Sequence, residues 1–165
     1  MREARKMTRG EQKMKRKGAS LLFLNSVGQV LLFLRDNKPE IPFPNCWDIL
    51  GGHVEEDEEP QTCIKREMQE EIEVDVVNPR LFNVYDMDDR LEYTFWTQAD
   101  LDIARLTLHE GQRLKWFSED DIKGMTDNLF AFNFKPIILD FYLKKPWQSG
   151  GKDSPTWLSI GLFSL

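Results

Sequence analysis

The feature that most constrains the fold is a short strand, a glycine pair and a helix that follow one another directly in the chain. Residues 47–50 are mostly apolar and lead straight into Gly51-Gly52. Pro60 suits the first turn of a helix, which we expect to extend to about Ile72. The glycine pair lets the backbone pass close to whatever lies at the start of that helix.

Three glutamates of this helix fall on one face. Glu67, Glu70 and Glu71 are spaced i, i+3 and i+4, which places them within an arc of about 100°. Like charges at this spacing destabilise a helix by about 0.2–0.5 kcal/mol per pair. A hard divalent cation such as Mg²⁺ or Mn²⁺ removes that cost, because it takes carboxylate oxygens and also binds substrate phosphates. The spacing favours a metal site over a solvated acidic face.

The distribution of charge supports this interpretation. The formal net charge is −6, which excludes a general nucleic-acid binder. Residues 1–17 hold eight Lys and Arg against two Glu, whereas residues 55–73 hold nine Asp and Glu against two Lys and Arg. The acidic segment needs a cation to relieve its self-repulsion.

The composition indicates in which cellular compartment, and with which kinds of partner, we expect the protein to work. The two cysteines, Cys46 and Cys63, are too few for a disulfide framework, so we expect a reducing, cytoplasmic location. No apolar run is long enough to span a membrane. We therefore expect no membrane partner, and a nucleic-acid partner only if the basic leader recruits one.

The order of elements predicts one mixed domain. We expect a basic leader (1–19), a domain (20–146) and a C-terminal tail (147–165). Within the domain, a hairpin joins 21–24 to 30–34, further strands cover 74–77, 81–85, 93–97 and 114–117, and a last helix begins at Pro136. This order is that of an α+β or α/β sandwich.

The pattern from Gly52 to Val74 resembles the Nudix box of the Nudix hydrolase family. Gly52 is followed after five residues by Glu58 and after seven more by Arg66-Glu67-Met68, then by Glu70-Glu71 and Glu73-Val74. Eight of the nine specified positions match. The exception is Glu73, where the family usually has glycine, and it is expected either to lengthen the helix or to change the following turn. The resemblance implies a Nudix-type α/β/α sandwich with a mixed β-sheet.

The resemblance also implies a reaction and a metal site. Family members hydrolyse a nucleoside diphosphate linked to another moiety, with Mg²⁺ or Mn²⁺. Glu67, Glu70 and Glu71 match the metal-binding carboxylates, and the Gly51 carbonyl is an additional ligand. Arg66 matches the arginine that holds the catalytic carboxylates, and Glu58 is its expected partner.

The sequence leaves two alternatives for the residue that acts as the general base. Glu67 or Glu71 in the helix could accept the proton of the attacking water. In some family members the base comes instead from a later loop, where Glu110 stands in this chain. The alternative for Glu110 is a solvated loop acid.

Three further residues are candidates for substrate contact. His53 could contact a phosphate, although a lone loop histidine is more often structural. Trp96 could stack on a base, although aromatic residues of a strand usually pack in a core. Asn133 resembles base-binding asparagines of relatives that hydrolyse nucleoside triphosphates, or it caps the last helix.

We therefore expect a pyrophosphohydrolase that acts on a nucleoside triphosphate, oxidised ones included. ADP-ribose or a nucleotide sugar is the alternative substrate. A nucleotide-binding module without activity, an RNA-end hydrolase that uses the basic leader and a diphosphate isomerase remain as competing classes, and a homodimer is left open.

Overall fold

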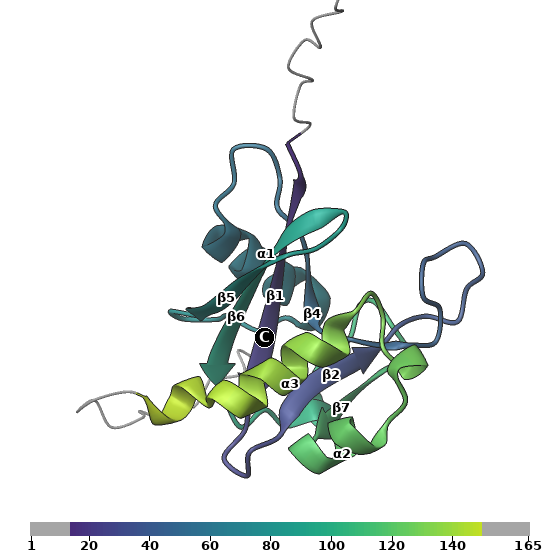
Figure 1. The fold of residues 1–165 in the computed structure, drawn as a ribbon, viewed down its shortest axis with the longest axis vertical. Helices are drawn as coiled ribbons and strands as arrows, with labels where there is room; N and C mark the ends of the chain where they lie inside the picture. The colour runs from purple at the N-terminus through teal and green to yellow at the C-terminus, as the bar shows by residue number, and fades with distance from the viewer. Residues whose placement is uncertain (1–13, 150–165) are drawn as a thin grey trace, which may run out of the picture.

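A mixed seven-stranded sheet forms the centre of the fold (Figure 1). The structure is a computed structural model and describes residues 14–149, so most of the predicted leader and tail lie outside the described residues. The strands are β1 (Arg16–Leu24), β2 (Val30–Leu34), β3 (Trp47–Asp48), β4 (Leu50–His53), β5 (Arg80–Asp86), β6 (Arg90–Gln98) and β7 (Arg113–Phe117). The α-helices are α1 (Pro60–Ile72), α2 (Glu119–Gly124) and α3 (Phe134–Lys144), and the 3₁₀ helices are η1 (Ile103–Arg105), η2 (Asp127–Leu129) and η3 (Pro146–Gln148).

β1 is the strand that joins the two ends of the sheet. The main path of the sheet is β3-β2-β1-β6-β5, with β4 also paired to β1 and β7 to β2. β1 and β6 are parallel, whereas β1 is antiparallel to both β2 and β4. The mixed sheet expected from the sequence is therefore confirmed.

Alternate residues of β1 serve two separate cores, as the period of two in a strand requires. Leu22 and Leu24 pack in the core beneath α3, and Leu21 and Phe23 pack in the core beneath α1. All four side chains are almost completely buried. α1 and α3 therefore cover opposite faces of the sheet, and the expected α/β/α sandwich is confirmed (Figure 1).

Three expected boundaries differ from the structure. Residues 74–77 form no strand, because Val74 and Val76 instead fill the core beneath α1 from an irregular segment. β1 already begins at Arg16, so the sheet includes the end of the predicted leader. α3 begins at Phe134, which places Pro136 in its first turn, where a proline is tolerated. No helix of the described residues is long and apolar enough to cross a membrane.

Glu73 ends α1 without lengthening it. Its φ of 56° and ψ of 35° are left-handed helical values, which glycine adopts at least cost. The Glu73 N–H donates to the Gln69 carbonyl at 3.2 Å, and the Val74 N–H donates to the Met68 carbonyl at 3.3 Å. The first of these is the 5→1 bond of an αL helix end, so the helix stops at the position where the family usually has glycine, and the expected lengthening does not occur.

We predict that Glu73→Gly stabilises the protein by about 0.5–1 kcal/mol, because it removes the strain of a side chain in a left-handed conformation. Chemical denaturation of the variant and the wild type measures the change. Glu73→Ala is the matched control, since it removes the same carboxylate but keeps a Cβ atom. Equal stabilities of the glycine and alanine variants would refute strain at this position.

Candidate active site

The glycine pair brings β4 and α1 close together. Gly51 lies opposite Ser20 of β1, where an added Cβ atom would collide with the backbone of Ala19. A Cβ atom on Gly52 would collide with the carboxylate of Glu67. Packing against the backbone therefore requires glycine at position 51, whereas Gly52 makes room for the carboxylate of a candidate metal ligand.

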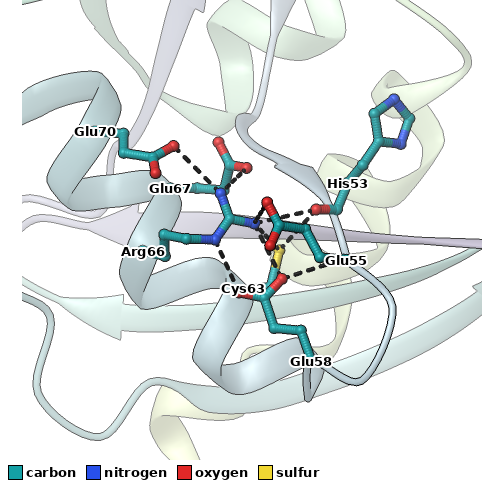
Figure 2. Close-up of polar contacts among 7 residues, drawn as sticks. All are labelled: His53, Glu55, Glu58, Cys63, Arg66, Glu67 and Glu70. Carbon is teal, nitrogen blue, oxygen red and sulfur yellow. Dashed lines mark hydrogen bonds and ion pairs between the residues drawn. The ribbon is translucent and has the colours of Figure 1, made fainter.

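Arg66 gathers the carboxylates of α1 and of the loop before it (Figure 2). Its Nε donates to Glu58 Oε1 at 2.8 Å and its Nη2 to Glu58 Oε2 at 3.0 Å, which is a two-pronged pair. Its Nη1 donates to Glu67 Oε1 at 2.9 Å and to Glu70 Oε2 at 3.2 Å. The hydrogen bonds from Arg66 lower the pKa of Glu58 to about 2. Glu58 is thus a permanent anion that fixes the guanidinium, as the sequence predicted for this pair.

Glu71 is the least satisfied group of the site. It is only 9% exposed, and its Oε2 is buried without a hydrogen-bond partner among the described residues. Burial, together with the nearby charges of Glu67 and Glu110, raises the pKa of Glu71 from 4.5 to about 9. A buried carboxylate oxygen with no partner is costly. A bound cation would remove that cost.

Glu67 lies between Arg66 and the glycine pair. Burial raises the pKa of Glu67, Arg66 opposes that rise, and the charges of Glu70 and Glu110 add to it. One of its oxygens is held by Arg66, so the carboxylate is fixed in orientation. Repulsion among these acids again favours a cation at this place.

The loop that carries Glu110 is tied to α1 and to β2. The His109 N–H donates to the Glu71 carbonyl at 2.9 Å, and the Gln112 N–H donates to the Leu34 carbonyl at 2.8 Å. Gly111 is held against the Phe33 ring with a φ of 94°, a value that favours glycine. These contacts place Glu110, itself exposed, at the rim of the same pocket.

The pocket has a volume of about 610 Å³, within the usual range for small-molecule sites. Six of the predicted site residues line it: Gly51, His53, Arg66, Glu67, Glu71 and Glu110.

Four predicted site residues do not line the pocket. Glu58 lies behind Arg66, and the side chain of Glu70 is 58% exposed beside it. Trp96 is 4% exposed in the core beneath α3, because its position on β6 faces that helix. Asn133 precedes α3 with an exposed side chain that makes no capping hydrogen bond.

Several pocket residues were not predicted from the sequence. They are charged or aromatic residues of β3 and β6, of the segment that follows β2 and of the segment before α3: Arg35, Asp48, Arg90, Glu92 and Phe132. Asp48 alone had a local signal, since it is a charged residue within an apolar strand.

The residues fit a hard divalent cation, although their side chains do not yet converge on one. Within residues 14–149, no three His, Cys, Asp or Glu side chains are grouped closely enough to hold a metal. One reason is that Arg66 holds an oxygen of Glu67 and one of Glu70. The unpartnered Glu71 oxygen and an all-oxygen donor set are nevertheless what Mg²⁺ or Mn²⁺ requires.

Comparisons with known proteins identify the family of this chain. The family model of the NUDIX domain matches residues 14–139. The chain therefore belongs to the NUDIX family. It is similar to an RNA pyrophosphohydrolase of Rhodospirillum rubrum, with 29% identity over 109 residues. That alignment covers 62% of this chain and 56% of the relative, so the chain matches little more than half of that curated protein.

Solved structures share the fold at low sequence identity. A MutT protein of Methanosarcina mazei Go1 has a TM-score of 0.62 and 20% identity over 82% of this chain and 99% of its own. A MutT NUDIX hydrolase of Burkholderia pseudomallei has a TM-score of 0.60 and 23% identity over 76% of this chain and 95% of its own. These likenesses establish the fold.

We predict that Glu71→Gln stabilises the metal-free protein in a pH-dependent manner. The raised pKa favours the folded state below about pH 4.5, and this contribution is lost as the pH rises towards about 9. The amide cannot ionise, so the variant should equal the wild type at pH 4.5 and exceed it by about 1–3 kcal/mol at pH 8. Denaturation in EDTA at both pH values measures the difference.

Glu70→Gln is the matched control, since it removes a more exposed carboxylate of the same helix and should have little effect. Millimolar Mg²⁺ should stabilise the wild type and do so less for Glu71→Gln, because a ligand that binds only the folded state raises its stability. An unchanged Glu71→Gln protein at pH 8 would contradict the strain assigned to this carboxylate.

Proposed function

We propose that this protein hydrolyses a phosphoanhydride bond of a small nucleotide with Mg²⁺ or Mn²⁺, and that a nucleoside triphosphate, cleaved to the monophosphate and pyrophosphate, is its substrate. The observation that carries the proposal is the unpartnered, buried oxygen of Glu71 beside Glu67 and Glu110. It lies in a pocket large enough for a nucleotide, in a chain of the NUDIX family.

The residues divide the work of the reaction. Glu67, Glu71 and the Gly51 carbonyl would hold the cation, which supplies charge neutralisation on the diphosphate oxygens and polarises a water molecule. Arg66 positions Glu67 and is itself fixed by Glu58. Water forms a new P–O bond at the attacked phosphorus, the bridging P–O bond breaks, and the leaving phosphate takes the electron pair.

We propose Glu110 as the acceptor of the proton from the attacking water. It lines the pocket near Glu67 and Glu71, and it is the member of this group that lies on a loop. A base within α1 would have to bind the metal and accept the proton at once. Glu110, which is not among the proposed metal ligands, would only have to accept the proton.

A second candidate is the 5′ end of RNA. The relative from Rhodospirillum rubrum is named an RNA pyrophosphohydrolase, and the bond cleaved would be of the same chemical kind. Arg16, from the basic N-terminal part of the chain, lines the pocket. A phosphate-binding leader would make the reaction strongly salt-dependent. ADP-ribose and nucleotide sugars are the remaining alternative substrates.

The two cysteines, Cys46 and Cys63, are both free thiols, which supports a reducing, cytoplasmic location for the protein.

Release of phosphate products tests the proposal. The wild type is incubated with Mg²⁺ or Mn²⁺ and with nucleoside triphosphates, ADP-ribose, nucleotide sugars and a 5′-triphosphorylated RNA oligonucleotide. We expect pyrophosphate release from nucleoside triphosphates and a loss of at least about 100-fold in Glu71→Gln. Nucleotide binding without any turnover would identify a binding module instead. Preference for the oligonucleotide at low salt would favour the RNA end.

For the base, we predict that Glu110→Gln lowers kcat by roughly 10²–10⁴-fold and removes the acidic limb of the pH–rate profile. Metal affinity should change little, because the ligands on α1 are untouched. Rates across pH 5–9, with Mg²⁺ titrations at each pH, measure both effects. A mild effect with an unaltered profile would move the base into α1, to Glu67 or Glu71.

A further inference from the structure

Two loops of the pocket wall meet at one side chain, that of Gln112. The rim loop, residues 35–46, joins β2 to β3 and stands out beside β2 (Figure 1). The Glu110 loop, residues 106–112, joins η1 to β7. The rim loop reaches the pocket through Arg35 and Pro42, and the Glu110 loop reaches it through Glu110. A contact between these loops therefore links two parts of the wall that are distant in the sequence.

Gln112 makes this contact at the point where the pairing of two strands ends. β2 and β7 are paired as far as Leu34 and Arg113, and the Gln112 N–H donates to the Leu34 carbonyl at 2.8 Å. Beyond this point the side chain forms the link. Its Nε2 donates to the Arg35 carbonyl at 2.7 Å and to Asn45 Oδ1 at 2.9 Å. One amide group thus binds both ends of the rim loop.

The rim loop is closed by bonds of its own. The Arg35 N–H donates to the Cys46 carbonyl at 2.9 Å, and the Asn45 N–H donates to the Asp36 carbonyl at 3.1 Å. Asn45 has a φ of 58°, a left-handed value that asparagine adopts more readily than most residues. The two acceptors of the Gln112 amide are therefore held in place before Gln112 binds them.

The position of Glu110 depends on its neighbours in the chain, because its own side chain is exposed. On one side, the His109 N–H donates to the Glu71 carbonyl of α1 at 2.9 Å. On the other side, Gly111 packs closely against β2 and Gln112 binds the rim loop. Glu110 therefore lies on a short segment that is held by α1 at one end and by the rim loop at the other.

The bonds of Gln112 matter for position more than for folding. Its side chain is exposed, and a hydrogen bond that water can replace adds little to the stability of a fold. Position is critical for a general base, which must lie within about 2.6–3.2 Å of the atom that gives up the proton. A displacement of about 1 Å can lower the rate by about 10²-fold.

We propose that Gln112 is a positioning residue whose amide joins the rim loop and the Glu110 loop into one unit and thereby sets the position of Glu110 relative to α1. Gln112 does not itself line the pocket, so it acts through Glu110. This inference rests on the proposed function, in which Glu110 accepts the proton of the attacking water.

Hydrogen exchange tests the link between the loops without turnover. Gln112→Met keeps the length of the side chain but removes its donor. The amides of Asn45 and His109 report on the two loops, and both should exchange at least about threefold faster in the variant, because exchange follows local opening. Amides of α3 should not change. Faster exchange of His109 alone, or of neither amide, would overturn the proposal.

Gln69→Met is the matched control for this substitution. Gln69 is an exposed glutamine of α1 that does not line the pocket. Its replacement should leave the exchange of both reporter amides and the rate of hydrolysis unchanged. An equal effect of the two variants would show that loss of any surface glutamine is enough, and would contradict a special role of Gln112.

A double-mutant cycle tests the role in catalysis. Gln112→Met should lower kcat by about 10–100-fold and change KM much less, because Arg66 and the carboxylates of α1 are untouched. In the Glu110→Gln protein the same substitution should have little further effect, since residues that act as a unit are not additive. Equal losses of kcat in both backgrounds would show that Gln112 does not act through Glu110.

Asn45→Gly covers the case in which Gln112→Met does not fold. Glycine accepts the left-handed backbone at position 45, so the variant removes one acceptor of the Gln112 amide without adding strain. Exchange of the His109 amide should become faster although the change lies in the other loop, and an unchanged rate there would count against the proposal. Coupled exchange without any turnover would leave the link intact while the proposed reaction fails. Turnover with unchanged exchange in both loops would do the reverse.

Discussion

The site depends on one guanidinium. Arg66 binds Glu58 through two parallel hydrogen bonds and also holds Glu67 and Glu70, so it sets the positions of three carboxylates from two elements. Because Glu58 remains ionised far below neutral pH, this arrangement is stable over the range in which proteins work. Glu71 receives no such support, and its unpartnered oxygen makes the pocket a place where positive charge is favoured.

Local patterns were enough to predict most of the fold. The apolar strands, the turn at 25–28 and the helix that begins at Pro60 are encoded by neighbouring residues, and the structure has them. The error at 74–77 shows the limit of such patterns. Val74 and Val76 alternate as in a strand, yet the segment belongs to no strand of the sheet and packs both side chains in the core beneath α1 from an irregular conformation.

The candidate site was predictable on one side only. The α1 side is a contiguous motif, so spacing alone placed Glu67 and Glu71 beside Gly51 in one pocket. The opposite wall combines Arg35 and Phe132 with residues of β6 that lie far away in the sequence, and no periodicity links them. Trp96 failed as a binding candidate for a related reason, because only the pairing of β6 with β1 decides which face its side chain meets.

The parallel pairing of β1 with β6 also governs how the pocket can be assembled. Ser20 and Thr94, whose hydroxyls lie 3.2 Å apart across these strands, are separated by 74 residues in the chain. Contacts of such long sequence separation carry a large loop-closure cost and slow the folding of a domain. The helix that bears the metal ligands is formed from local contacts and can appear early. The floor of the pocket forms only after β6 has been synthesised and has paired with β1. A nascent chain that ends before β6 would therefore contain the acidic helix but not the complete pocket.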